Sequence, residues 1–234
     1  ILITGGSRGI GKKVFELLNN DKNTVFLISN NQNRINQLKK NSGSKNIHIF
    51  KCDLQNYKKM KKIIKSIGHI DILINNASIN IIKSFEKFSL LDANRMIDIN
   101  FKSYFFCTQE VLRNRKKNND EIIIINISSI MGKVAQPIDS DRPQLMYICL
   151  KHAIEGLTKG ICTEYAGKNV RINSVCPTYV NTKLVEKTLK DKKKRNKIIN
   201  KIPSKRIAET IDVANVVQFL CSDKSKMING TSIM

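Results

Sequence analysis

Apolar runs and amphipathic stretches alternate along most of the chain. Short apolar runs rich in β-branched residues predict strands, at 1–4, 24–29, 46–51, 70–75, 121–128 and 170–176. Apolar residues at helical spacing predict helices between them, at 10–18, from the second strand to 41, and at 57–67, 90–117 and 145–165. Helices that regularly follow strands are typical of a parallel sheet covered on both faces. The pattern therefore predicts an α/β fold with a doubly wound parallel sheet.

A single domain accounts for the whole chain. The run Glu121–Ser128 is apolar almost throughout, as in a strand buried on both faces of a parallel sheet, and Val170–Cys176 repeats the pattern. No linker rich in Pro, Gly or Ser divides the 234 residues, so we predict one Rossmann-fold domain over 1–234. Ile1–Thr4 and Asn229–Met234 both have the pattern of strands, and we expect the protein to continue beyond both ends. A targeting peptide would lie before Ile1, so the compartment stays open.

The composition excludes several classes of protein. With 41% hydrophobic residues, 4 Pro and 11 Gly, the chain is not collagenous, low-complexity or disordered. No run approaches the roughly 18 apolar residues of a membrane-spanning helix, so a soluble protein without a membrane partner is predicted. The six cysteines form no C-x-x-C pair, which predicts free thiols in a reducing compartment such as the cytoplasm or the mitochondrial matrix. The three histidines lack metal-ligand spacing, and no metal site is expected.

Basic residues outnumber acidic ones by 41 to 19, which gives a net charge of +22. Such a charge favours an acidic partner, but basic residues spread over nearly every predicted helix are also typical of a solvated surface. The most basic stretch, 187–205, is predicted to be helical and to end at Pro203. We interpret 183–206 as an insertion that forms a lid over the substrate, with a solvated helix face as the alternative. No nucleic-acid-binding motif is recognised, so no nucleic-acid partner is expected.

A glycine-rich turn joins the first predicted strand to the first helix. Residues 4–11 read T-G-G-S-R-G-I-G. Glycines at 5, 9 and 11 allow a tight turn, close approach of the backbone to a pyrophosphate, and close helix packing. The N-terminus of the following helix offers free N–H groups to the anion. The context predicts a dinucleotide-binding site.

The spacing G-x-x-x-G-x-G resembles that of the short-chain dehydrogenase/reductase family, and the resemblance extends along essentially the whole chain. Cys52-Asp53-Leu54 is similar to the family's aspartate after the third strand, which holds the adenine. Residues 75–78 are similar to its Asn-Asn-Ala-Gly, with Ser78 in place of the glycine, and residues 177–182 to its Pro-Gly-x-x-x-Thr, with Thr178 in place of the glycine. The resemblance implies that the cofactor is bound by Gly5, Ser7, Arg8, Gly9, Ile10, Gly11, Ser29, Asn30, Asp53, Leu54, Asn76, Ala77, Tyr147, Lys151, Pro177, Val180 and Thr182.

Tyr147 and Lys151 are four residues apart on a predicted helix and so share one face. A nearby ammonium lowers the pKa of a tyrosine, which would make Tyr147 a proton donor and acceptor for a carbonyl. The resemblance implies a catalytic tetrad of Asn100, Ser129, Tyr147 and Lys151, in which Ser129 binds the substrate oxygen and Lys151 also holds the nicotinamide ribose. Asn100 would hold the water that passes protons to Lys151. Ser128 is a rival to Ser129, which we prefer because it begins Ser-Ile-Met-Gly, as in the family's Ser-x-x-Gly.

The end of the second strand bears on the choice of nicotinamide cofactor. Residues 27–31 read L-I-S-N-N, without the carboxylate that would bind a ribose 2′-hydroxyl and repel a 2′-phosphate. Arg8 in the glycine turn, and also Arg34, could pair with a phosphate. We therefore predict NADP(H). In the alternative, Arg8 is a solvated turn residue and Asn30 binds a bare ribose.

Two features bear on the substrate. Residues 136–144 form a long polar stretch before Tyr147, and Arg142-Pro143-Gln144 resembles polyol and ketose reductases of the family. Residues 126–129 and the basic lid resemble 3-oxoacyl-[acyl-carrier-protein] reductases. Acyl carrier proteins are acidic, and such a partner would be steered by the basic residues Lys187, Lys190, Lys192, Lys193, Lys194 and Arg195.

We expect an NADPH-dependent 3-oxoacyl-[acyl-carrier-protein] reductase of fatty-acid synthesis, with a polyol or ketose oxidoreductase as the alternative. A non-catalytic nucleotide- or RNA-binding protein is a more distant possibility. The resemblance also implies a homodimer or homotetramer formed through the helices 90–117 and 145–165. Ala153, Gly156 and Gly160 would allow close helix approach there, or would serve packing against the sheet.

Overall fold

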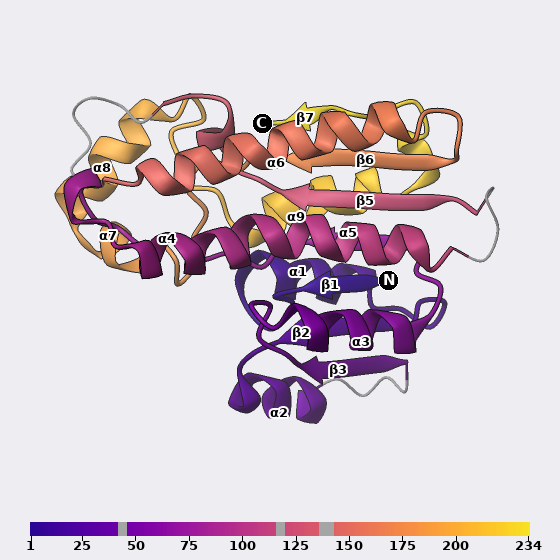
Figure 1. Ribbon diagram of the computed structural model, residues 1–234. Coiled ribbons are helices and arrows are strands. Elements are labelled where there is room, and N and C mark those ends of the chain that lie inside the picture. Colours follow the sequence, from indigo (N-terminus) through magenta and orange to yellow (C-terminus); the bar gives the residue numbers. More distant parts are fainter. Residues whose placement is uncertain (42–45, 116–119, 136–142) are drawn as a thin grey trace.

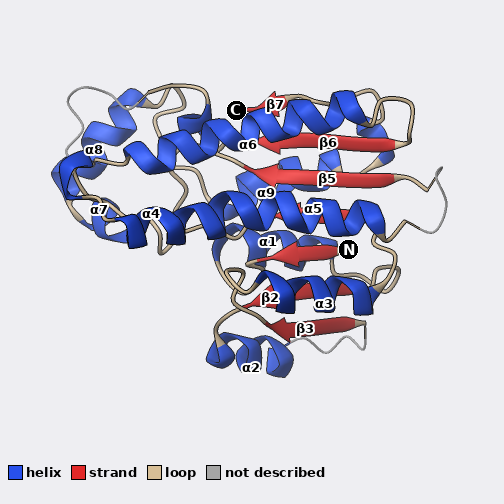
Figure 2. Ribbon diagram, viewed as in Figure 1, coloured by secondary structure: helices blue, strands red, loops and turns tan. Residues whose placement is uncertain are grey.

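The computed structural model describes residues 1–41, 46–115, 120–135 and 143–234. Within them, one parallel sheet has the strand order β3-β2-β1-β4-β5-β6-β7 (Figures 1 and 2). Its strands are β1 Leu2–Thr4, β2 Val25–Ser29, β3 Ile47–Lys51, β4 Ile72–Asn75, β5 Ile122–Ile127, β6 Val170–Val175 and β7 Ser232–Ile233. The order reverses between β1 and β4, which is the point where doubly wound sheets bind ligands. The predicted Rossmann fold is confirmed.

Helices cover both faces of this sheet. They are α1 Gly9–Leu18, α2 Gln32–Asn41, α3 Tyr57–Ile67, α4 Leu90–Ile97, α5 Ser103–Arg113, α6 Leu145–Glu164, α7 Glu186–Lys190, α8 Lys192–Lys201 and α9 Thr210–Leu220. In the view of Figure 1, α3, α5 and α6 lie in front of the sheet and α1 and α9 lie behind it.

Strand β5 shows how the sheet divides the core. Ile122 and Ile124 join the apolar cluster that includes α3 and α5, whereas Ile123 and Ile125 join the cluster that includes α1 and α9. Successive side chains of a strand point to opposite faces. Every residue of β5 is buried, which explains the almost continuous apolar run in the sequence.

The helix expected over 90–117 is interrupted around Asn100, one of the expected catalytic residues. The chain forms α4, then a π-helix at Asp98–Lys102, then α5, which ends at Arg113. The π segment contains Asn100, whose side chain bonds to a neighbouring loop. Such segments are frequent at functional sites. The spacing of the apolar residues gives no sign of this interruption.

Residues 181–207 form an excursion whose two ends meet. Val180 and Ala208 pair as an isolated parallel bridge, and the N–H of Asn181 donates to the Ala208 carbonyl at 2.8 Å. The excursion contains α7 and α8, so the basic stretch is helical before Pro203, as expected, but in two separate helices. Asp191 separates the two helices and caps α8, because its carboxylate accepts a hydrogen bond from the Lys194 N–H at 3.2 Å.

Helix α9 was not identified from the apolar pattern. It begins at a capping box formed by Glu209 and Asp212. Its apolar side chains, which include Val213 and Val217, pack with Val14 of α1 in one cluster.

Two further expectations concern the chain as a whole. All six cysteines are free thiols, as predicted, and Cys52, Cys107 and Cys176 are buried. Across the described ranges, the helices are too short or too polar to span a lipid bilayer.

Candidate active site

The glycine turn after β1 is locked to the loop after β4. The Gly5 N–H donates to the Ile28 carbonyl at 2.9 Å, and Gly5 has a φ of +67°, a conformation that favours glycine. A Cβ on Gly11 would lie 2.4 Å from Asn76 Nδ2. That amide donates to the carbonyls of Thr4 at 3.0 Å and Gly5 at 3.2 Å. The glycines therefore permit the close approach of two loops at the sheet's switch point.

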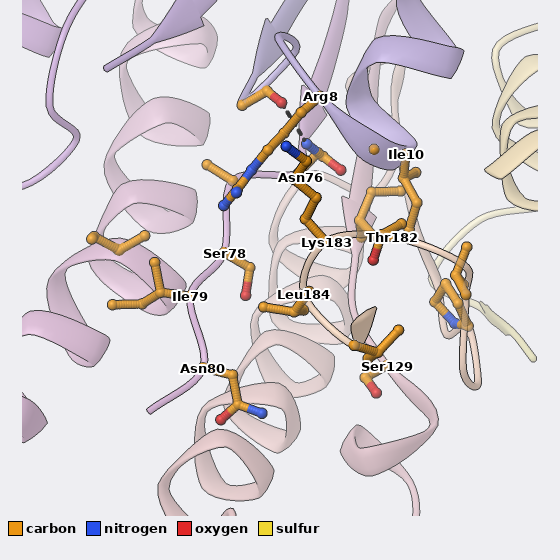
Figure 3. Close-up of a pocket in the computed structure, with 18 of the residues that line it drawn as sticks. Arg8, Ile10, Asn76, Ser78, Ile79, Asn80, Ser129, Thr182, Lys183 and Leu184 are labelled. Atoms are coloured by element: carbon orange, nitrogen blue, oxygen red, sulfur yellow. Dashed lines mark hydrogen bonds between the residues drawn. The ribbon is translucent and has the colours of Figure 1, made fainter. Parts of the chain in front are cut away.

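A pocket of about 740 Å³ opens at this edge of the sheet. Its lining includes nearly all residues expected to bind the cofactor, from Gly5 in the glycine turn to Thr182 after β6. Gly11 is the exception, and Asn100 of the expected tetrad also lies outside the lining. Figure 3 shows Arg8, Asn76 and Lys183 gathered at one end of the pocket, with Ser129 at the other. The expected cofactor and catalytic residues thus meet in one cavity.

The end of the pocket near β2 carries positive charge. Arg8 and Arg34 both line it. Partial burial lowers the pKa of the Arg8 guanidinium, and the positive charge of Arg34 lowers it further. Ser29 at the end of β2 donates to the Ser7 hydroxyl at 2.8 Å, which ties the glycine turn to this strand. Two guanidinium groups, which can pair with phosphate, therefore line this end of the pocket.

Lys151 lies at the opposite end and is almost completely buried. Its Nζ donates to the Ile127 carbonyl at 2.8 Å. Burial lowers the pKa of Lys151 to about 8, although electrostatic interactions with Cys176 and Glu155 oppose the shift. The Tyr147 ring centroid lies 5.4 Å from Nζ, so Tyr147 and Lys151 lie together, as their spacing predicted.

Tyr104 of α5 is a neighbour of Lys151 that the sequence did not reveal. Its hydroxyl donates to the same Ile127 carbonyl at 3.0 Å, and its ring centroid lies 5.5 Å from Lys151 Nζ. Complete burial raises its pKa well above the usual value. A tyrosine in an amphipathic helix carries no signal for this role, because the contact joins three elements distant in sequence.

The turn after β5 presents Ser129. The Ser129 hydroxyl accepts a hydrogen bond from the Met131 N–H at 3.2 Å, and the Ile130 N–H donates to the Pro177 carbonyl at 3.0 Å. A Cβ on Gly132 would lie 3.0 Å from Ser128 Oγ, so the Ser128 hydroxyl faces this turn. The geometry supports Ser129 as the residue that meets substrate, and this role stays a prediction.

Asn100 is held by side-chain bonds to the loop after β4. Its Oδ1 accepts from the Ile79 N–H at 2.9 Å and the Ser78 hydroxyl at 3.3 Å, while its Nδ2 donates to the Ile79 carbonyl at 2.7 Å. The loop after β4 therefore fixes the orientation of the amide, and the expected water-binding role of Asn100 stays a prediction. Ser78, which replaces a family glycine, adds one bond to this arrangement.

A polar pair on the substrate side was also missed. Asn80 and Gln144 both line the pocket, and Asn80 Nδ2 donates to Gln144 Oε1 at 2.9 Å. The contact joins the loop after β4 to the residue that precedes α6. Residues 136–142, including Arg142 and most of the long polar stretch expected to border the substrate, lie outside the described residues.

Comparisons with known proteins show which family the chain resembles. The family described as short chain dehydrogenase matches residues 1–193. The chain is 32% identical over 232 residues to the 3-oxoacyl-[acyl-carrier-protein] reductase FabG of Rickettsia felis. The matched region covers 99% of this chain and 92% of that protein.

The chain is also similar in fold to proteins of solved structure. ElxO with NADP bound has a TM-score of 0.88 and 31% identity, over 99% of this chain and 94% of ElxO. The aldohexose dehydrogenase of Thermoplasma acidophilum, in ligand-free form, has a TM-score of 0.83 and 28% identity, over 99% of this chain and 90% of that protein.

Proposed function

We propose that this chain, which belongs to the short-chain dehydrogenase family, is an NADPH-dependent 3-oxoacyl-[acyl-carrier-protein] reductase. Family membership confirms the resemblance seen in the motifs and identifies the protein as an NAD(P)-dependent oxidoreductase. The observation that supports carbonyl reduction most directly is the convergence of Ser129, Tyr147 and Lys151 on the cavity that the glycine turn opens.

These residues can deliver a proton to a carbonyl oxygen. When bound, the nicotinamide supplies the hydride. Ser129 would donate a hydrogen bond to the substrate oxygen, and the Tyr147 hydroxyl would donate the proton as negative charge develops there. The Lys151 ammonium would favour the phenolate that remains. Its own orientation is fixed by the Ile127 carbonyl.

Arg8 and Arg34 support NADP(H) over NAD(H). Both arginines line the pocket beside the end of β2, where residues 27–31 supply no carboxylate. Burial, and then the nearby charge of Arg34, lower the pKa of Arg8. A 2′-phosphate would offset the repulsion between the two arginines, and guanidinium groups form strong bonds with phosphate. ElxO, similar at 31% identity, has NADP bound.

The excursion 181–207 supports a carrier-bound substrate. Lys183 and Leu184 at its start line the pocket. The α8 helix beyond them has no buried residue and exposes Lys192, Lys193 and Arg195. An acidic carrier protein would be attracted to this surface as its acyl chain enters. The similarity to the FabG protein of Rickettsia felis favours the same substrate class.

A homodimer or homotetramer is part of the proposal. Phe85, Leu90 and Leu91 are exposed by 73%, 77% and 78%, around the start of α4. Large apolar side chains gathered on a surface mark interaction sites.

The decisive experiment follows NADPH oxidation with an acetoacetyl thioester and with a panel of ketoses. Thioester turnover in the wild type, reduced about a thousandfold in Tyr147→Phe, would support the proposal. NADPH binding, followed by its fluorescence, should persist in the variant because Lys151 and the glycine turn remain. A wild type that reduces only ketoses, or a variant that keeps most of its turnover, would contradict the proposal.

A polyol or ketose oxidoreductase is the second candidate. The Asn80–Gln144 pair favours it, because amide groups beside the pocket can bind the hydroxyls of a sugar. The aldohexose dehydrogenase of Thermoplasma acidophilum is similar at 28% identity. Ketose turnover without thioester turnover would favour this candidate.

A further inference from the structure

Glu155 is a buried carboxylate close to the site but without a role in the chemistry described so far. It lies on α6, four residues after Lys151 and eight after Tyr147, and only 5% of it is exposed. Residues four apart on a helix share a face. Glu155 therefore continues the face that carries the two catalytic side chains, one turn deeper in the protein.

Four elements meet at this carboxylate. Its Oε2 lies 2.6 Å from Lys133 Nζ and accepts from the Ser174 hydroxyl at 3.0 Å. The Ser232 hydroxyl of β7 also donates to Oε2, and Cys176 Sγ lies 3.5 Å from Oε1. Burial alone would raise the pKa of Glu155, but the bonds from Lys133 and the serine hydroxyls hold it below its usual value. The carboxylate is thus ionised at neutral pH.

Lys133 connects this carboxylate to the turn that presents Ser129. It follows the 3-10 helix Ile130–Gly132 directly. A Cβ on Gly132 would lie 2.8 Å from the Lys151 carbonyl oxygen, so the turn packs on α6 at the catalytic lysine itself. One residue later, the ion pair between Lys133 and Glu155 also joins this turn to α6.

The Lys133–Glu155 ion pair also affects the protonation of Lys151. The groups that face Lys151 are Tyr147 and Glu155 on α6, Tyr104 on α5, and Cys176 after β6. Glu155 is the carboxylate among them. Its negative charge favours the Lys151 ammonium, and the positive charge of Lys133 partly cancels that effect.

We propose that Glu155 and Lys133 form a positioning pair, which holds the Ser129 turn against α6 and sets the proton affinity of Lys151 through two opposed charges. The inference rests on the proposed carbonyl reduction. Neither residue touches the reacting atoms.

The test compares Glu155→Gln with Lys133→Met across pH. Turnover should fall about tenfold in both, because the turn is released. The pH at which the reduction rate falls, on the alkaline side of the profile, should shift in opposite directions in the two variants. It shifts to lower pH by about one unit in Glu155→Gln, which loses the anion, and to higher pH in Lys133→Met, which loses the cation.

Asp223→Asn and Lys226→Met are the matched controls. These residues form an exposed pair, 3.2 Å apart, in the segment that contacts Arg171 at the amino-terminal end of β6. Removing either charge should leave the pH profile where it is in the wild type. Lys133 is about a quarter exposed, so Lys133→Met carries the test if Glu155→Gln does not fold.

Shifts of opposite sign, larger than those of the controls, would support the pair. Shifts of the same sign, or none, would overturn it, even with full carbonyl reduction in the wild type. If the wild type reduces no carbonyl, the proposed function fails separately. The pH dependence of NADPH binding, read by fluorescence, then decides: opposite shifts in the two variants support the pair, and equal or absent shifts overturn it.

Discussion

The cations at the two ends of the pocket lie in different surroundings. At the end near β2, Arg8 is exposed, lies near a second cation in Arg34, and has no ion pair with a carboxylate of the described residues. At the other end, Lys151 is buried and held by the Ile127 carbonyl, with Glu155 one turn away. The first end brings two arginines together, whereas at the second end the protein itself supplies the partners of Lys151. Substitutions at these two cations should therefore differ in kind as well as in size.

The largest effect is expected from Lys151→Met. Turnover should fall at least a hundredfold, because the ammonium beside Tyr147 is lost. Stability should rise by about 1–3 kcal/mol below pH 8, since the cost of a buried ammonium disappears and Tyr104 still donates to the Ile127 carbonyl. Urea unfolding and steady-state kinetics measure the two effects.

The pH dependence of unfolding checks the same prediction. The pKa of Lys151 is about 8 in the folded protein and 10.5 at its ordinary value. Between these values the unfolded chain holds the proton and the folded one does not, so wild-type stability should gain a contribution as pH rises from 8 to 10.5. Lys151→Met should lack this contribution. An equal slope in both proteins would contradict the assignment.

A smaller effect, confined to one cofactor, is expected from Arg8→Gln. The KM for NADPH should rise about 10- to 100-fold, because one or more charge-assisted bonds to the 2′-phosphate are lost. The KM for NADH serves as the internal control and should change little. Equal changes for both cofactors would show that Arg8 serves the pyrophosphate or the turn, and would contradict its role in selecting NADPH.

The smallest effect is expected from Tyr104→Phe. The variant loses one of two donors to the Ile127 carbonyl, so unfolding should cost about 1 kcal/mol less, and turnover should fall a few-fold. Tyr57→Phe is the matched control, because it removes a hydroxyl that donates to Glu110 at 3.2 Å, between α3 and α5. It should lose similar stability and keep its turnover. Equal turnover in both variants would remove Tyr104 from the support of Lys151.

Sequence patterns predicted the fold well because the same residues both form and bury the strands. The run Glu121–Ser128 contains the whole of β5, since a strand buried on both faces must be apolar at nearly every position. The glycine turn could also be predicted from the sequence. Gly5 needs its positive φ, and Gly11 has no room for a side chain.

The supports of the catalytic residues were not predictable in the same way. Tyr104 and Glu155 act through contacts between α5, β5, α6 and β7, and no local period records such contacts. The π-helix at Asn100 likewise arises from bonds to Ser78 and Ile79, some twenty residues earlier. Spacing identifies side chains that share a face, but it does not identify their partners on another element.

The bridge between Val180 and Ala208 has a consequence for how the protein can be altered. The two ends of the excursion are pinned to each other by main-chain hydrogen bonds, so the sheet does not depend on what lies between them. The length of such a closed loop affects stability only weakly, and loops positioned by a rigid scaffold carry specificity. We therefore expect residues 183–207 to be exchangeable, with Thr182 kept as a predicted cofactor-binding residue. A chimaera carrying the corresponding segment of a sugar dehydrogenase should fold as the parent does and take its substrate preference from the donor.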